Sequence, residues 1–476
     1  MRTAAVTGIH VFVPRLRLAR SSIAAATAWA NPQAAKAKGS RSICNWDEDA
    51  LTMAVAAARG AMGNEHSVDA LWLASTTLPF ADRSNAALVG EALDLDPAHA
   101  GTDVTGSLRA GTGALLRAIG NSCSGAQLVI ASDARKARPA SPEELKYGHG
   151  AVALRIEATA DPLAQLLGSA ELSADFVDHY RGTDADFDYT LEERWVRDEG
   201  LTKLIPAAVD RALAAASLQR TDLHAAILPG GGAMARAIAR AAKLGECPLT
   251  PDLAADVGDC GAAQPLMMLA AALDAAQPGQ NILLVGFGQG VDALVLRSGG
   301  AAALARKSSL NTAISAGRAE EQYVRYLSHA GIVDVDFGMR AERDNRSAQS
   351  TAWRRHRDVN GFVGGRCSAC QAVQFPRARV CVNPECRATD TQQPYRLANS
   401  RGRVKTFTED WQAYSPRPPY IYGNVAFEEG GNLLMEFADL ATGELVVGDQ
   451  VSFEFRIKDF DTRRGFRRYF WKAVKS

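Results

Sequence analysis

A strand, a turn of small residues and a helix occur twice in this chain, and this repetition limits the fold more than any other feature. The first copy runs over residues 103–119, and the second starts at Asp256 and continues into an apolar helix at 262–275. The strand patterns that follow, at 126–131 and 281–286, also correspond. Because each helix follows its strand, parallel strands with right-handed crossovers are favoured. The order of several such units predicts an α/β protein with two similar halves.

Length and charge narrow the function classes. A chain of 476 residues holds two or three domains. Lys+Arg and Asp+Glu both number 53, so the chain has no net positive charge to attract nucleic acid or an anionic membrane. No apolar run approaches the roughly 18 residues of a membrane helix. Arg15, Arg17 and Arg20 interrupt what would be the apolar core of a signal peptide. We expect a cytoplasmic protein.

Four of the eight cysteines are clustered, whereas Cys44, Cys123, Cys247 and Cys260 are scattered. The cluster forms two short-spaced pairs, and each pair lies on a turn tight enough to aim both sulfurs at one ion. Four thiolates complete a tetrahedron and leave no position for water, which predicts a structural zinc. The ligands are Cys367, Cys370, Cys381 and Cys386.

The last part of the chain has five alternating strand patterns separated by glycine-containing turns. This number and spacing fit a small all-β barrel of the OB type. Such barrels often bind single-stranded nucleic acid, but the balanced charge argues against that role here. The patterns lie at residues 402–408, 422–427, 433–437, 450–456 and 469–474.

Three stretches carry a resemblance to a known family. Asn45–Met53, Ser107–Leu115 and Gly258–Leu273, the last followed by the glycine-containing strand 278–288, resemble the hydroxymethylglutaryl-CoA synthases of the thiolase superfamily. The resemblance covers about residues 1–300. It implies a duplicated five-layer αβαβα domain, an acyl-CoA thioester as substrate and a homodimer formed through this domain. The zinc ribbon and barrel resemble the accessory module that accompanies thiolase-like enzymes as a separate subunit.

From these features we expect four segments along the chain. Residues 1–300 form the thiolase-like domain, 301–350 a linker or helical arm, 351–396 the zinc ribbon and 397–476 the OB fold.

The residues that carry the family's chemistry are replaced. In the family a turn with the motif Ala-Cys-x-Ala-Gly-Thr holds the nucleophile, and the same register here begins Ser107-Leu108-Arg109. The family's histidine falls in the glycine turn 230–232, and its asparagine is Asp259. The segment that holds the family's glutamate contains no carboxylate. An acyl-enzyme at position 108 is therefore excluded.

Three functions stay open. The first is Claisen-type acyl transfer or thiolytic cleavage, with Cys260 as a relocated thiol whose pKa a helix N-terminus would lower; the alternative for Cys260 is inert packing. The second is retro-aldol cleavage of a β-hydroxyacyl-CoA, which needs only a base and donors for the enolate. The third is a non-catalytic subunit that pairs with an active one.

Several residues are candidates for this chemistry. Asp259 is the expected base, with a helix N-cap as its alternative role, and His179 and Tyr189 are further acid–base candidates. Amides of Gly230 and Gly231 are candidate donors. A basic stripe at i, i+4 and i+7 lies where the family holds CoA phosphates, although a solvated face explains it as well. The stripe consists of Arg236, Arg240 and Lys243.

Overall fold

The structure is a computed structural model that describes residues 4–63, 65, 67–121, 125–340 and 348–476, so Cys123 lies outside the described residues. It divides into two units, neither of which is one continuous stretch of chain. Unit 1 comprises Met1–Asn45, Asp49–Ala87 and Ala98–Tyr326. Unit 2 comprises Trp46–Glu48, Leu88–Pro97 and Leu327–Ser476.

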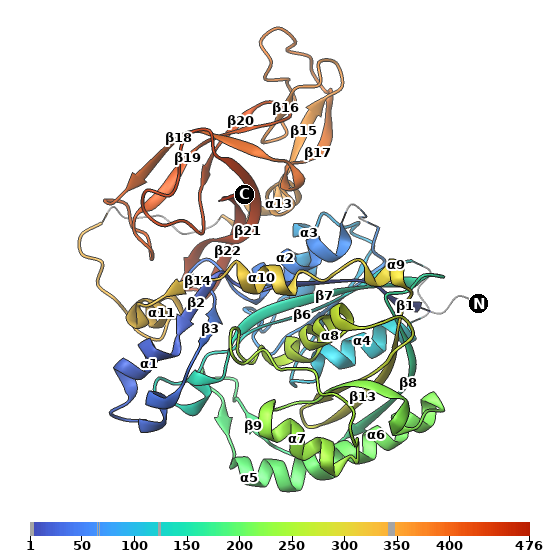
Figure 1. Cartoon of the computed structure of the whole chain (residues 1–476). Helices are drawn as coiled ribbons and strands as arrows, with labels where there is room; N and C mark the ends of the chain where they lie inside the picture. The colour runs from blue at the N-terminus through green and yellow to red at the C-terminus, as the bar shows by residue number, and fades with distance from the viewer. Residues whose placement is uncertain (1–3, 64, 66, 122–124, 341–347) are drawn as a thin grey trace. The chain divides into compact units, whose positions relative to one another are not determined.

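Unit 1 is built on a nine-stranded mixed sheet with the order β11-β12-β13-β8-β1-β7-β6-β4-β5 (Figure 1). Most of its central strands are buried on both faces, as their runs of valine, isoleucine, leucine and alanine predict. The strands are β1 (Ala4–Phe12), β4 (Ala70–Ala74), β5 (Ala100–Val104), β6 (Gln127–Ala134), β7 (His149–Ala158), β8 (Ala164–Ser173), β11 (Leu223–Ile227), β12 (Asn281–Phe287) and β13 (Gly290–Ser298).

The pairing pattern of this sheet repeats in its two halves. In the first half β4 is parallel to β6, β6 is antiparallel to β7, and β7 is antiparallel to β1. In the second half β11 is parallel to β12, β12 is antiparallel to β13, and β13 is antiparallel to β8. The halves meet where Val6 of β1 pairs with Ala164 of β8. The predicted duplication is confirmed.

One predicted strand is wrong. We expected Asp256-Val257 to end a strand, as Asp103-Val104 does in β5. Instead, the amides of Val257 and Gly258 both donate to the carbonyl of Leu253, so the backbone closes into a turn. The counterpart of β5 in the second half is a single parallel bridge between Leu249 and Ala226.

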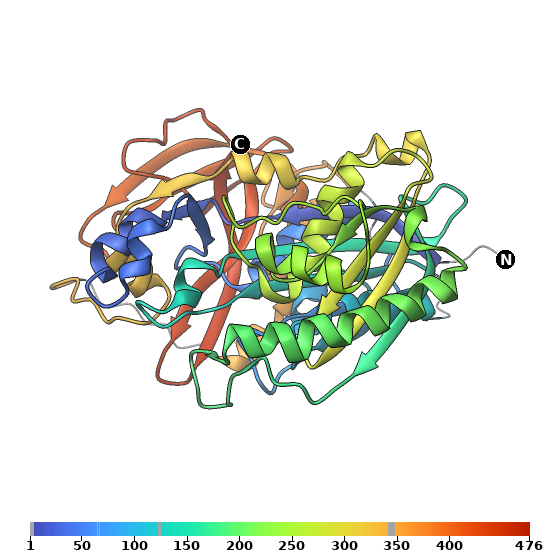
Figure 2. The ribbon, with the colours of Figure 1, turned by 60° about the horizontal axis from the view of Figure 1, so that its bottom comes forward.

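Five layers follow from the helices. Helices α4 (Ala110–Gly120) and α8 (Gln264–Ala275) lie side by side between the two halves of the sheet (Figure 1). Helix α2 (Ala50–Met62) covers the outer face of the first half. Helices α6 (Thr202–Ala216) and α7 (Gly232–Ala241) belong to the second half, where α6 runs along β8 and β13 (Figure 2). This is the expected αβαβα arrangement.

The cap of α2 differs from the expected one. The sequence predicts Asp47 as the N-cap, whereas Asp49 takes this position. Its carboxylate accepts hydrogen bonds from the amides of Leu51 and Thr52, and the Thr52 hydroxyl accepts from the Asp49 amide. The helix starts two residues later because this capping box satisfies its first amides.

The remaining elements of unit 1 include part of the expected linker. The strand β14 pairs in parallel with β2, and α11 begins only after this strand, later than the helix expected near 319–330. Residues 301–326 therefore belong to unit 1. The elements are β2 (Leu16–Ala19), α1 (Arg20–Thr27), β3 (Ser40–Ile43), β9 (His179–Tyr180), β10 (Tyr189–Thr190), α5 (Glu193–Trp195), α9 (Ala301–Leu304), α10 (Leu310–Ser315) and β14 (Arg318–Glu320). The residues of α3 (Asn85–Ala92) and α11 (Tyr323–His329) are divided between the two units.

Unit 2 contains a three-stranded ribbon and a five-stranded barrel. The ribbon has the order β16-β15-β17 and the barrel the order β20-β19-β18-β21-β22. The elements are α12 (Gln349–Arg354), α13 (His356–Asn360), β15 (Val363–Cys367), β16 (Val373–Gln374), β17 (Gln392–Arg396), β18 (Gly402–Asp410), β19 (Tyr420–Phe427), β20 (Asn432–Glu436), β21 (Gln450–Asp461) and β22 (Phe466–Lys475).

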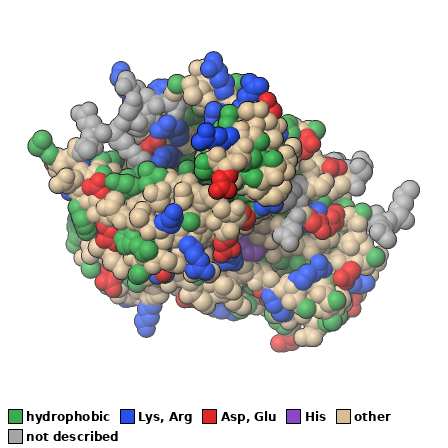
Figure 3. Space-filling model, turned by 90° about the horizontal axis from the view of Figure 1, so that it is seen from above, with side chains coloured by type: hydrophobic (Ala, Val, Ile, Leu, Met, Phe, Trp, Pro, Cys, Tyr) green, Lys and Arg blue, Asp and Glu red, His purple; other side chains and the backbone are tan. Residues whose placement is uncertain are grey.

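The barrel closes as an OB fold does. A parallel bridge between Phe437 and Ala473 joins the end of β20 to β22, so each strand has two neighbours. Aromatic side chains fill the interior, among them the buried Phe453 and Trp471. All five predicted strands are confirmed. Acidic and basic side chains are interspersed on the molecular face in Figure 3. In the described part of the chain, no helix is long and apolar enough to cross a membrane.

Candidate functional site

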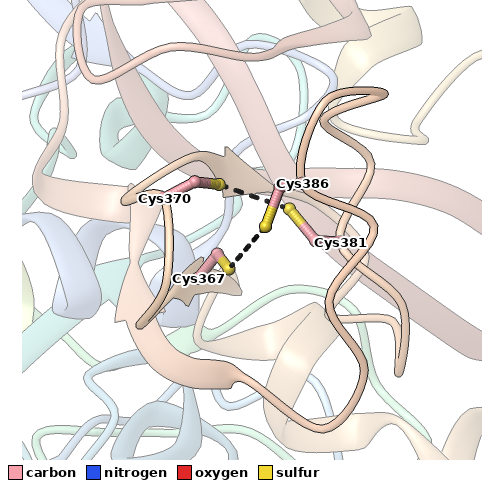
Figure 4. A group of neighbouring side chains, drawn as sticks. All are labelled: Cys367, Cys370, Cys381 and Cys386. Carbon is pink, nitrogen blue, oxygen red and sulfur yellow. Dashed lines mark hydrogen bonds between the residues drawn. The ribbon is translucent and has the colours of Figure 1, made fainter.

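The four clustered cysteines converge in the ribbon of unit 2 (Figure 4). Cys367 ends β15, and its sulfur lies 3.8 Å from that of Cys386. The sulfurs of Cys370 and Cys381 are 3.6 Å apart, and all four lie within 4.8 Å of one another. A tetrahedral zinc with Zn–S bonds of about 2.3 Å places its ligands about 3.8 Å apart. The geometry fits a structural zinc with four thiolate ligands, as predicted.

The turn that carries the family's nucleophile is closed by hydrogen bonds to a second loop. Leu108 lies in this turn, between β5 and α4, half-buried. On either side of it, the Ser107 hydroxyl donates to the carbonyl of Gly288 at 2.7 Å and the Arg109 Nε donates to the same carbonyl at 3.2 Å. The turn is therefore fixed to the loop between β12 and β13.

A buried carboxylate completes this connection. Asp292 of β13 is inaccessible to solvent, lies 2.6 Å from the Arg109 guanidinium and accepts from the Thr112 hydroxyl at 2.8 Å. Burial raises the pKa of Asp292, although Thr112 and Arg109 oppose this shift. These residues stabilise the turn and present no nucleophile.

Cys260 does not have the environment of a reactive thiol. Its side chain has 0% exposure, and its sulfur packs against Gly150. Burial raises the pKa of the Cys260 thiol well above its ordinary value, and the carboxylates of Asp259 and Asp133 add to this effect. The expected lowering of the pKa by a helix N-terminus is wrong, because desolvation dominates at this position.

Asp259 directly precedes the N-cap, a position that Cys260 occupies. Its carboxylate accepts from the amide of Gly261 at 2.8 Å, at the start of the short helix that leads into α8. Its backbone is fixed by the Lys146 carbonyl and the Gly148 amide, both at 2.8 Å. The side chain is nevertheless exposed and lies in the electrostatic field of Arg135.

Sequence reasoning missed a carboxylate that lies beside the residues following β4. Asp133 of β6 is fully buried, and five donors from Ser75, Thr76, Thr77 and Ala262 bond to it at 2.7–3.0 Å. It therefore occupies the region in which the sequence shows no acid. The available signal was an aspartate at the end of a buried strand, where only strong partners make a carboxylate tolerable.

A second buried cluster adjoins this carboxylate. Asp188 lies 2.7 Å from the guanidinium groups of both Arg135 and Arg181 and accepts from the Tyr147 hydroxyl at 2.9 Å. Arg135 also lies over the Tyr147 ring, 3.8 Å from its centroid. Burial alone would raise the pKa of Asp188. The positive charges of Arg135 and Arg181 have the larger combined effect, so the pKa of Asp188 is lowered. Arg181 reaches the Thr76 carbonyl at the end of β4.

A pocket of about 240 Å³ opens beside this cluster. Tyr189, one of the predicted site residues, lines it and packs against Tyr180 with ring centroids 5.4 Å apart. Cationic and hydroxyl side chains give the pocket donors for an anionic group, and the carboxylates of Glu143 and Asp188 also line it. The lining residues are Lys136, Ala137, Arg138, Ser141, Glu143, Tyr147, Asp188, Tyr189 and Thr190.

His179, another predicted site residue, lies in β9 and forms a pair with Asp178. The imidazole Nδ1 is 2.9 Å from the Asp178 Oδ2. The side-chain amide of Gln289, in the β12–β13 loop, donates to Asp178 Oδ1 at 3.1 Å. His179 is thus placed next to the loop that holds the closed turn at Leu108.

The predicted phosphate site is only partly assembled. Gly230 and Gly231 form a turn with positive φ before α7, but a side chain at Gly231 would meet the Asp252 carboxylate at 2.0 Å. This negative neighbour disfavours an anion at the turn. Arg236 and Arg240 are exposed on α7, whereas Lys243 lies beyond its end.

Comparison with known proteins adds the family relationships. Residues 354–392 match the ChsH2 rubredoxin-like zinc ribbon domain. The hydroxymethylglutaryl-CoA synthase of Thermococcus sibiricus is 27% identical over 260 residues, which are 52% of this chain and 74% of the relative. That of Methanosarcina mazei is 28% identical over 313 residues, which are 60% of this chain and 86% of the relative.

Solved structures agree on the fold. A hydroxymethylglutaryl-CoA synthase complexed with CoA superposes with a TM-score of 0.61 at 16% identity, covering 73% of this chain and 95% of that protein. The 3-oxoacyl-(acyl carrier protein) synthase III of Pseudomonas aeruginosa gives 0.55 at 23% identity, covering 63% and 99%. The chain combines a thiolase-like domain, similar to hydroxymethylglutaryl-CoA synthases, with a fused zinc ribbon and OB barrel.

Proposed function

We propose that this thiolase-like protein is an enzyme that breaks or forms a carbon–carbon bond in an acyl-CoA thioester without an acyl-enzyme. The reaction type that the geometry supports best is retro-aldol cleavage of a β-hydroxyacyl-CoA. The observation that carries this proposal is that neither of the two candidate nucleophile positions presents a reactive thiol. Position 108 is a leucine in a closed turn, and the nearby thiol of Cys260 is fully buried with a raised pKa.

The chemistry of the two reactions explains why this observation matters. Thiolytic cleavage must transfer an acyl group to an acceptor, and in the family the thiolate of a cysteine takes that group first. A retro-aldol step transfers no acyl group; it needs a base for the hydroxyl proton and stabilisation of the thioester enolate. Loss of the thiol removes a requirement of the first reaction only.

Substrate binding is proposed from the relatives and from the pocket. A solved relative is complexed with CoA, a ligand with several phosphates. In this chain the pocket beside Asp188 offers the cations of Lys136 and Arg138. We assign the anionic part of the thioester to this pocket, where Asp188 is paired with Arg135 and Arg181, rather than to the glycine turn before α7, where Asp252 opposes an anion.

Claisen-type acyl transfer is the second candidate, because the similar proteins are named as synthases of acyl thioesters. It would proceed here without a cysteine intermediate. The family also suggests a homodimer through unit 1, which sedimentation of the full chain tests. A non-catalytic role beside an active partner is the third candidate, and any turnover by the purified chain alone removes it.

Covalent labelling tests the proposal. The full-length protein is incubated with acetyl-CoA and with acetoacetyl-CoA, digested and mapped by mass spectrometry. We expect no acyl group on any cysteine, and none at residue 108. Acylated Cys260 would contradict the proposal and support acyl transfer.

The Leu108→Cys variant is the matched control. It restores a thiol at the family's position, so the mapping method must detect acylation there if that thiol reacts. We expect no thiolase turnover from this variant, because the turn 230–232 contains no histidine to activate the thiol.

A further inference from the structure

We propose that His179 is the general base of this site and that Asp178 and Gln289 hold its imidazole in position. This inference rests on the proposed carbon–carbon bond chemistry. It assigns the proton transfer to one nitrogen atom, and it gives the loop between β12 and β13 a role in positioning that atom.

The pair of His179 and Asp178 has a defined proton arrangement. A carboxylate only accepts hydrogen bonds, so the imidazole nitrogen 2.9 Å from Asp178 Oδ2 is the one that carries the proton. The other nitrogen, Nε2, then has a lone pair and faces away from the carboxylate. The two side chains are 15% and 14% exposed, so the pair is largely buried and its surroundings hold it in place. This is how a carboxylate orients a catalytic histidine.

Gln289 fixes this pair to the altered nucleophile turn. Its side-chain amide donates to Asp178 Oδ1 at 3.1 Å and to the backbone carbonyl of His179 at 3.4 Å. The preceding residue, Gly288, accepts the hydrogen bonds of Ser107 and Arg109. The base and the turn at Leu108 are therefore attached to adjacent residues of one loop.

The chain segment after His179 continues along the same site. Arg181 bonds to the Thr76 carbonyl at the end of β4 and pairs with Asp188, which lines the pocket. His179 is thus linked to the closed turn through Gln289, and its backbone pairs with Thr190, which lines the pocket that we assign to the thioester.

Other candidate bases in the site are less suitable. The carboxylate of Asp259 holds the Gly261 amide. The hydroxyl of Tyr147 donates to Asp188, and burial raises the pKa of Tyr147. The thiol of Cys260 is buried. His179 combines a ring nitrogen with a lone pair and an orienting carboxylate.

The proposed step conserves atoms and electrons. His179 Nε2 takes the proton of the substrate's β-hydroxyl group, and the oxygen lone pair forms the carbonyl double bond. The bond between the α and β carbons breaks, and its electron pair forms the enolate of the thioester. The imidazolium then returns the proton to the α carbon. One carbonyl compound and one acyl-CoA leave, and no oxidant, reductant or free CoA is consumed.

Exchange of α protons with solvent tests the assignment without knowledge of the full substrate. Full-length enzyme is incubated with propionyl-CoA and with acetyl-CoA in deuterium oxide, and deuterium at the α carbon is followed by mass spectrometry. His179→Gln should slow the exchange by about 10²-fold or more, the usual scale for a general base. Asp178→Asn should slow it less, because the imidazole persists without its orienting partner. Added imidazole should restore part of the exchange in His179→Ala.

The controls separate the base from the proposed function. His224, an exposed histidine of β11, provides the matched variant His224→Gln, which should exchange at the wild-type rate. An unchanged rate in folded His179→Gln would overturn the assignment and leave the proposed function standing. Absence of exchange by the wild-type enzyme with both thioesters would count against the proposed function itself. Circular dichroism of each variant establishes that it is folded.

Discussion

Replacing Arg456 by methionine should destabilise unit 2 strongly. Arg456 lies in β21 and contacts two carboxylates, Glu48 and, at 2.6 Å, Asp439. The exposed fractions of the Arg456 and Glu48 side chains are 4% and 1%, so water screens little of their charge. Methionine keeps most of the length and apolar volume of the stem. The variant therefore tests the charge and not the packing.

The expected loss of stability follows from the buried carboxylates that remain after the substitution. Breaking a buried ion pair by removing one partner costs about 3–5 kcal/mol, because the remaining charge has no compensation. Two carboxylates lose their contact with Arg456 here, so we expect a loss at or above the lower limit of that range. The double variant Arg456→Met/Glu48→Gln should recover part of it, since one of the two buried negative charges beside position 456 is then removed.

Hydrogen exchange of backbone amides in β21 and β22 measures the opening free energy of this unit directly. The control is Arg379→Met, also in unit 2, whose ion pair with Asp390 is exposed at 79% and 62%. Exposed pairs contribute about 0–1 kcal/mol, so this variant should change little. A loss below about 1 kcal/mol in Arg456→Met, equal to that of the control, would refute the reasoning.

Two further predictions concern the metal and pH. Elemental analysis should find one zinc per chain. Cys370→Ser should lower this content and unfold the ribbon, while unit 1 keeps its structure. Well under one zinc in a folded wild-type protein would contradict the predicted zinc site. Burial lowers the pKa of His149 to about 3 and that of His10 to about 4, so both stay neutral in the folded state while the unfolded chain binds protons below about pH 6.5. Stability of unit 1 should therefore fall as pH decreases from 6.5 toward 4, by about 1.4 kcal/mol per pH unit for each histidine, and His149→Gln should reduce this slope in urea titrations at several pH values.

The fold followed from the sequence where local patterns and long-range order agreed. The duplication was predictable because two strand, turn and helix units share an order, and the barrel because its five strands alternate. The strand expected at Asp256 failed because backbone hydrogen bonds to Leu253 favour a turn, which no side-chain pattern reveals. The cap of α2 moved from Asp47 to Asp49 because three acidic residues in a row offer several N-caps.

The site was less predictable, since its residues come from distant segments. The zinc ligands lie within twenty residues and their spacing alone defines them. Asp133 gave only the signal of an aspartate near the end of a buried strand and Asp188 gave none, because their significance depends on Thr76, Arg135 and Arg181 reaching them across the fold. The direction of the pKa shift of Cys260 was misjudged for the same reason: a sequence shows the helix that follows a thiol but not its burial. His149, without an explanation in the sequence, is a structural residue whose Nδ1 accepts from the Cys44 amide.

The products formed in the absence of free CoA test the proposed chemistry most directly. Short-, medium- and long-chain β-hydroxyacyl-CoA thioesters, and the matching β-oxoacyl-CoA thioesters, are incubated with the full-length protein with and without CoA. Retro-aldol cleavage predicts one aldehyde or ketone and one shorter acyl-CoA per turnover, at a rate independent of free CoA. Cleavage that acts only on β-oxoacyl-CoA, requires free CoA and yields two thioesters would contradict this account and establish acyl transfer.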